Sequence, residues 1–268
     1  MTDVDSPSAR RIPGALLAIA VVVVLALATL LLPWPVARAI DGTSWAGPSE
    51  LTRAVGDGLV SDWSQGVREP GHGESALATA THFWMVFHIV KALLAAGLVL
   101  ASSWLLAIAW QARRVSRGRV ARLALLLASG AASAVVLLAT VIVIANIQGA
   151  FAPLASLLSF LTSGEVTPAL AQTAQSLGTD LAGSLPSATA ATIAHDFSTY
   201  HAVVAILLGA TTLVAGAMAV RLIRHHEWLA GGALTAVGLA FVVLTAANVG
   251  TALNPTPALS SFLATVAS

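Results

Sequence analysis

The chain has 268 residues, of which 57% are hydrophobic and only 9% are charged, and its mean hydropathy is +0.86. Soluble chains carry about 25% charged residues, so this composition excludes an ordinary soluble domain, and the apolar blocks are long enough for bilayer spans. Without cysteine there is no disulfide, thiolate metal site or redox dithiol, and a net charge of +1 indicates no nucleic acid or other polyanionic partner.

The first predicted element is a transmembrane anchor at 14–33, after a polar N-terminal segment 1–13 that contains Arg10 and Arg11. This apolar run can cross a core of roughly 30 Å at 1.5 Å per residue. It is longer than a signal-peptide core, and the rest of a twin-arginine motif is missing. We therefore expect an uncleaved anchor with 1–13 in the cytoplasm. The alternative is a leader that is cleaved after Ala39.

The segment 34–81 is predicted to lie outside the cytoplasm and to contain one amphipathic helix. Pro48 is typical of a first helical position. Apolar side chains then recur every four residues until Gly66, at Leu51, Val55, Leu59 and Trp63. We expect this helix to lie on the membrane or against other loops.

Four further apolar runs predict transmembrane helices, at 82–110, 123–147, 200–220 and 228–253. Five arginines crowd the break within the first pair, and two arginines and two histidines fill the break within the second. The segments 148–199 and 254–268 contain no Lys or Arg. The positive-inside rule therefore places the N-terminus and both breaks in the cytoplasm and the C-terminus outside. The sequence predicts an all-α integral protein of the plasma membrane with five transmembrane helices.

The outer segment between the two pairs carries two more helical patterns. The first, Pro153 to Leu161, is mostly apolar and is predicted to be interfacial. The second lies in a linker at 162–194, where Thr167 and Pro168 are typical of a helix start. Its expected apolar face consists of Leu170, Leu177, Leu181 and Leu185. With the helix after Pro48, these short helices are expected to form a small cap over the outer ends of the spans.

One two-span unit occurs twice in the chain. His82 and His88 recur as His195 and His201, since 195 − 82 = 201 − 88 = 113. Asn146, Pro153 and the Ser-Phe-Leu triplet at 159–161 recur 102 residues later. The two offsets differ by 11 residues (113 − 102), which a deletion of that length in the central break of the second copy explains. We therefore expect two tandem hairpin repeats, 82–161 and 195–263. Both keep the same orientation, so they are parallel repeats related by an axis along the membrane normal.

The repeats place polar residues at one depth. Counting about 20 residues from the cytoplasmic charges brings four residues to the outer boundary: His88, His201, Asn146 and Asn248. Their pairing by the pseudo-twofold axis predicts a polar cluster. It would also include Lys91, one turn below the first histidine, and Asp196, its only acidic member.

Two facing histidines, His88 and His201, are candidate ligands of a haem iron, or of a divalent metal with further ligands. His82 and His195, six residues higher, are candidate metal ligands. Histidines at this depth are also candidate proton-linked groups. The competing interpretation is that His and Asn at helix ends are hydrated or cap backbone groups under an aromatic belt.

Several motifs resemble those of an uncharacterised family of multi-pass membrane proteins from actinobacteria. They are the Pro-Trp-Pro after the first span, the opening at 196–201, and the Ala-Asn endings before a proline at Asn146 and Asn248. The resemblance covers most of the chain and implies an actinobacterial plasma membrane. It implies no activity and no ligand.

No motif of nucleophilic, phosphate-binding or zinc-dependent catalysis accompanies these residues. The sequence therefore favours a non-enzymatic binding or assembly module whose partners are the lipid bilayer and other membrane proteins. One alternative is a b-type haem or metal-binding redox protein that uses His88 and His201. Another is a small-molecule transporter built on the parallel repeats, against which the uncharged span cores argue.

Overall fold

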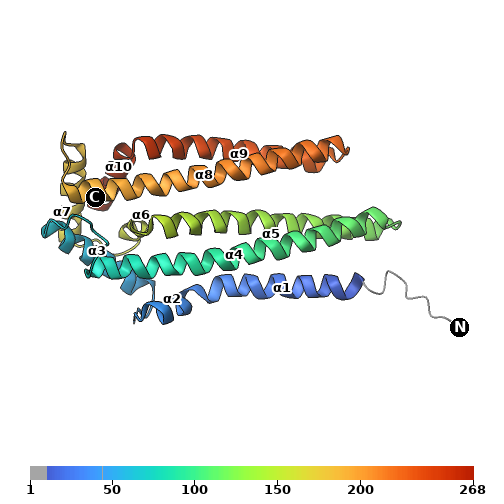
Figure 1. Cartoon of the computed structure of the whole chain (residues 1–268), viewed down its shortest axis with the longest axis horizontal. Coiled ribbons are helices and arrows are strands. Elements are labelled where there is room, and N and C mark those ends of the chain that lie inside the picture. The colour runs from blue at the N-terminus through green and yellow to red at the C-terminus, as the bar shows by residue number, and fades with distance from the viewer. Residues whose placement is uncertain (1–10, 44) are drawn as a thin grey trace. The chain divides into compact units, whose positions relative to one another are not determined.

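The computed structural model describes residues 11–43 and 45–268, and this part of the chain is helical almost throughout, without strands (Figure 1). Most of the expected cytoplasmic segment 1–13 falls outside the described residues. The helices fall into two classes, long apolar ones and short amphipathic or apolar ones.

Five helices are long and apolar enough to cross a membrane: α1 (Arg11–Leu31), α4 (Ala76–Val115), α5 (Arg119–Phe151), α8 (Ala188–Arg224) and α9 (Trp228–Leu253). The predicted class is confirmed, since the protein is an all-α, multi-pass membrane protein with five spans. In the most apolar stretch of each of these helices, only 11–28% of the residues are buried. Apolar side chains exposed in this way suit lipid, because acyl chains solvate leucine as well as a protein core does.

The helix α4 is much longer than the predicted span at 82–110. Its 40 residues correspond to about 60 Å, twice the thickness of a bilayer core. The early start has a local cause, because Ser75 Oγ accepts a hydrogen bond from the Ala78 amide (3.1 Å) and so caps the first turn. About half the length of α4 therefore extends beyond a bilayer core of ordinary thickness.

Six short helices complete the described chain: α2 (Pro33–Asp41), α3 (Pro48–Ser64), α6 (Pro153–Leu158), the 3₁₀ helix η1 (Ser159–Thr162), α7 (Pro168–Ala182) and α10 (Thr256–Ala267). Four of them begin with proline, whose fixed φ and missing N–H suit the first helical position. The helices α3, α6 and α7 lie where the sequence predicts them, whereas α2 and α10 were not predicted.

The chain divides into two compact units, Met1–Val36 with Phe87–Asn146, and Ala37–Val86 with Ile147–Ser268. In the first unit α1 packs along α4, and the Leu25 side chain lies 3.6 Å from the position that a Cβ on Gly97 would occupy. The ring of Trp34 meets Phe87 edge-on, with centroids 6.2 Å apart. The first contact joins α1 to α4, and the second joins the start of α2 to α4.

In the second unit the helices α3, α6, η1, α7 and α10 pack together, and we call this group the cap. α10 packs on α7, where Leu177, Leu259 and Leu263 are 0% exposed. Gly58 lets α3 approach the start of α4, because a Cβ there would lie only 2.8 Å from the Leu77 backbone nitrogen. The cap thus has a water-excluding core of its own.

One detail of the predicted apolar face of α7 was wrong. Leu185 is 90% exposed, because α7 ends at Ala182 and the next residue, Gly183, is extended. Leu170, Leu177 and Leu181 are buried as expected. Thr173 and Ala174 complete the face.

Candidate functional site

Each long hairpin contains one histidine–asparagine hydrogen bond between its two helices. His88 Nδ1 lies 2.8 Å from Asn146 Oδ1, and His201 Nδ1 lies 2.7 Å from Asn248 Oδ1. Each asparagine Nδ2 donates to the backbone carbonyl four residues earlier, at 2.7 and 2.8 Å. The amide oxygen is therefore the acceptor, and the imidazole donates the proton on Nδ1.

The two pairs differ in burial. His88 and Asn146 are 8% and 5% exposed, whereas His201 and Asn248 are half-buried. The first pair lies in the first unit and the second pair in the second. Each histidine has its hydrogen-bond partner within its own hairpin, and the expected pairing of His88 with His201 stays a prediction.

Asp196 has a structural contact of its own. Its Oδ2 accepts a hydrogen bond from the Ala155 amide (2.7 Å), the third residue of α6. The residue before α6, Ala152, offers no side-chain cap. Asp196 therefore acts as a distant N-cap, and its negative charge complements the positive end of the helix dipole.

Lys91 lies above an aromatic ring. Its Nζ is 5.3 Å from the centroid of Phe87, a distance typical of a cation–π interaction. Phe87 in turn meets Trp34. Lys91 thus joins the aromatic contacts between α2 and α4.

The structure adds an acidic residue that sequence reasoning missed. His82 Nδ1 is hydrogen-bonded to Asp41 Oδ1 at the end of α2, and the side chains are 58% and 6% exposed respectively. The other carboxylate oxygen of Asp41 is buried without a hydrogen-bond partner. This pair was missed because α2 was not predicted, although Pro33 at its first position is a usable signal.

The two candidate metal ligands have separate environments. His82 is bonded to Asp41, and His195 is exposed beside Asp196. Among the residues that the structure describes, no three His, Asp or Glu side chains gather in a way that could hold a metal ion. A metal at either histidine would need ligands beyond these residues.

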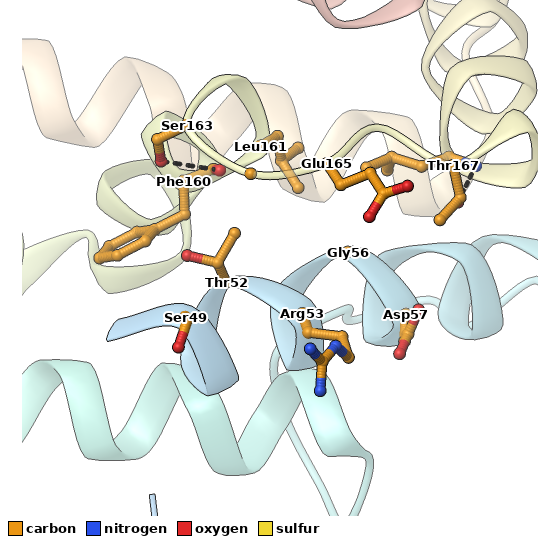
Figure 2. A pocket seen from close by; sticks show the side chains of 12 residues that line it. Ser49, Thr52, Arg53, Gly56, Asp57, Phe160, Leu161, Ser163, Glu165 and Thr167 are labelled. Atoms are coloured by element: carbon orange, nitrogen blue, oxygen red, sulfur yellow. Dashed lines mark hydrogen bonds between the residues drawn. The ribbon is translucent and has the colours of Figure 1, made fainter. Parts of the chain in front are cut away.

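A pocket of about 310 Å³ opens in the cap between α3 and the segment that leads from η1 into α7 (Figure 2). Its inner wall is apolar and includes Leu161 and Leu170, both buried. Three charged side chains stand at its exposed side: Arg53, Asp57 and Glu165. The remaining lining is formed by Ser49, Thr52, Gly56, Phe160, Ser163, Gly164 and Thr167.

Two glycines bring the pocket walls together. A Cβ on Gly164 would lie 2.5 Å from Thr52 Cγ2, and one on Gly56 would lie 3.4 Å from a Leu170 methyl. Thr167 Oγ1 accepts from the Leu170 amide (3.2 Å), which fixes the start of α7 at the pocket edge. The charged groups are therefore carried by a rigid frame.

The charges of the pocket are mixed. Arg53 and Asp57 lie four residues apart on α3, and Glu165 lies opposite them (Figure 2). No ion pair within the described parts of the chain joins Arg53 to either carboxylate. All three groups are exposed and can bind polar groups of a ligand.

No known protein family, curated protein or solved structure matches the chain. The function is therefore inferred from the site itself. The histidine–asparagine bonds join helices within a hairpin, whereas the cap pocket offers charged groups on a packed surface. The cap pocket is the better candidate for binding.

Proposed function

We propose that this protein is a non-enzymatic binding module of the plasma membrane, in which five spans hold the cap outside the cytoplasm and the cap pocket binds the ligand or partner. One observation carries the proposal. The buried Leu161 and Leu170 of the cap form the apolar wall of a pocket with exposed charges, so the binding groups are held on a packed domain. Preorganisation of this kind lowers the entropic cost of binding.

The proposed orientation rests on charge. All cap helices except α3 lie in segments without any Lys or Arg, while arginines crowd the α4–α5 and α8–α9 turns. The positive-inside rule then puts both turns and the N-terminus in the cytoplasm, and the cap and the C-terminus outside. The resemblance to actinobacterial membrane proteins supports a plasma membrane in such a bacterium.

The proposed tandem repeat has two supports in the helices. The ends of α5 and α9 are offset by 253 − 151 = 102 residues, as Asn146 and Asn248 are. The same ring nitrogen and the same amide oxygen bond in both hairpins. Both turns contain three residues, 116–118 and 225–227. In the proposed repeat the deletion of 11 residues would then fall in the helices and not in the break.

The pocket chemistry favours a zwitterionic or hydrogen-bonding group with an apolar part. Arg53 is suited to a carboxylate or phosphate, and Asp57 and Glu165 to an amine. The buried Leu161 and Leu170 are suited to the apolar part. Such a group is found on a polar small molecule and on the extracytoplasmic segment of a partner membrane protein.

Photo-crosslinking in whole cells tests this proposal. A photoreactive residue at Arg53 should give an adduct of defined mass, whereas the same residue at Thr179, on the exposed part of α7 outside the pocket lining, should not. Adducts that are identical at both positions, or that contain only bulk lipid, would contradict a binding role for the pocket. The adduct mass separates a small molecule from a protein partner.

A second candidate function, haem binding, is favoured by one observation. Metal-bound histidines usually donate their second ring N–H to an oxygen acceptor, as His88 and His201 do through Nδ1. In this candidate Nε2 is the ring nitrogen that would hold the iron. The purified protein would show a Soret band, which His88→Ala and His201→Ala would each abolish. A protein without visible absorbance after haem supplementation would contradict it.

A further inference from the structure

Two carboxylates of the cap pocket, Asp57 and Glu165, differ from most other carboxylates of the second unit. Five of those others accept a hydrogen bond from another part of the chain: Asp41, Glu50, Asp62, Asp180 and Asp196. Within the described ranges Asp57 and Glu165 accept no hydrogen bond and join no ion pair, and both residues are exposed. They are therefore available to a ligand.

The hydroxyl groups of the pocket add further acceptors. Thr52 Oγ1 donates its proton to the Pro48 carbonyl (2.9 Å), and Ser163 Oγ donates to the Phe160 carbonyl (3.0 Å; Figure 2). A hydroxyl that has given its single proton to the chain offers only lone pairs to a ligand. The lining is therefore rich in acceptors, and a ligand with several hydrogen-bond donors fits it best.

The part of the second unit that carries the pocket is negatively charged. Segments 37–81, 148–199 and 254–268 contain nine Asp or Glu, three Arg and no Lys, so their side chains sum to 3 − 9 = −6 with His neutral. Such a field attracts cations and repels anions before any contact forms. The lining itself contains two carboxylates and one guanidinium. Both the field and the lining favour a cationic ligand.

The size and the apolar wall of the pocket limit the kind of cation. Leu161 and Leu170, 2% and 4% exposed, form the wall, and the volume of about 310 Å³ is small for a ligand site. A bare metal ion is not suited, since no three His, Asp or Glu side chains of the described chain gather in a way that could hold one. A protonated amine on an aliphatic stem is suited, because its head carries three N–H donors and its stem is apolar.

We infer that the ligand of the cap pocket is a primary amine on a short aliphatic stem. Its ammonium group donates to Asp57 and Glu165, and its methylene groups lie against Leu161 and Leu170. This inference rests on the proposed function, since it names the chemical class that the same pocket binds. A free aliphatic amine and the lysine side chain of a peptide share this chemistry.

Titration calorimetry of the purified full-length protein in neutral detergent tests the inference. Butylamine should bind at least tenfold more tightly than butyrate, which has a stem of similar length and the opposite charge. The variant Asp57→Asn/Glu165→Gln should bind butylamine on the order of 100-fold more weakly, roughly tenfold for each hydrogen bond to a charged group. Arg53→Gln should strengthen butylamine binding a few-fold, because it removes the competing positive charge.

The variant Glu69→Gln/Glu74→Gln is the matched control, since it makes the same change of charge outside the pocket lining. It should weaken butylamine binding by no more than a few-fold. Equal weakening in the two double variants, or tighter binding of butyrate, would overturn the inference. If the pocket double variant unfolds at a lower temperature, Asp57→Asn and Glu165→Gln alone should each weaken binding about tenfold.

Two arms separate the sources and the levels of the proposal. Lysine blocked as an N-acetyl methylamide should bind as tightly as butylamine if the source is a peptide, and should be excluded if it is a free amine. A defined adduct at Arg53 in whole cells, together with a preference for butyrate, would leave the proposed function standing and overturn the amine. The absence of both an adduct and amine binding would overturn both.

Discussion

The cap and the spans use the same residue type in opposite ways. Leu177 and Leu263 in the cap are 0% exposed, whereas Leu213 in α8 and Leu229 in α9 are 76% and 92% exposed. The cap leucines are buried away from water, so the hydrophobic effect stabilises the cap. The span leucines face lipid, so association of the spans depends on close packing and on interhelical hydrogen bonds such as the two histidine–asparagine bonds.

The largest expected effect concerns the sides of the membrane on which the cap and the α4–α5 turn lie. Single cysteines are introduced at Ser176, on the exposed face of α7, and at Ser116, in the α4–α5 turn. An impermeant maleimide on whole cells should label position 176 and leave position 116 unlabelled until the cells are permeabilised. The reverse pattern would invert the proposed orientation.

The next effect is on cap stability. Leu177→Ala should lower the free energy of cap unfolding by about 2–5 kcal/mol, because it leaves a cavity in a packed core. Leu213→Ala, on a lipid-facing surface, should change it by less than about 0.5 kcal/mol. Pulse proteolysis of the cap measures both. Equal effects of the two substitutions would contradict the claim that only the cap leucines are stabilised by burial in a packed core.

Asp196→Ala should have a smaller effect, about 1–2 kcal/mol, since it removes the N-cap of α6. Hydrogen exchange should become faster at the Ala155 amide and its neighbours in α6. His195→Ala is the control at the adjacent, exposed position and should leave exchange unchanged. Unchanged protection of Ala155 in the Asp196 variant would show that the carboxylate does not cap the helix.

The smallest effect concerns the hydrogen bonds within the hairpins. Interhelical hydrogen bonds in membranes average about 0.6 kcal/mol, so Asn248→Ala should destabilise the second hairpin by roughly that amount. Asn146→Ala should cost more, because His88 is buried and would keep an unsatisfied N–H. Double-mutant cycles with His88→Ala and His201→Ala, measured by steric trapping, give the two coupling energies. A coupling energy near zero in both hairpins would show that these hydrogen bonds do not stabilise the hairpins.

The spans were predictable from sequence because a bilayer imposes length and composition on every helix that crosses it. The cap was only partly predictable. The helix α10 has twelve residues, too few for a span, and its role depends on contact with α7, which no local pattern reveals. The helix α2 was missed in the same way, and with it Asp41.

The depth of the candidate polar residues stays a prediction, and their hydrogen-bond partners could not be predicted from the sequence. Counting residues fixes how far His88 and Asn146 lie along their helices. It does not fix the rotation of each helix about its axis, which decides which side chains meet. Residues on neighbouring helices of one hairpin already have matching depths, so His88 bonds to Asn146 and His201 to Asn248.

The position of α10 in the chain has a consequence for the order of folding. Leu259, Leu263 and Val266 are fully or almost fully buried in the cap, yet α10 follows all five spans in the chain. The earlier cap helices expose the apolar surface that receives α10 until α9 has been made and inserted. A chain truncated before Thr256 would present this apolar surface to quality-control proteases.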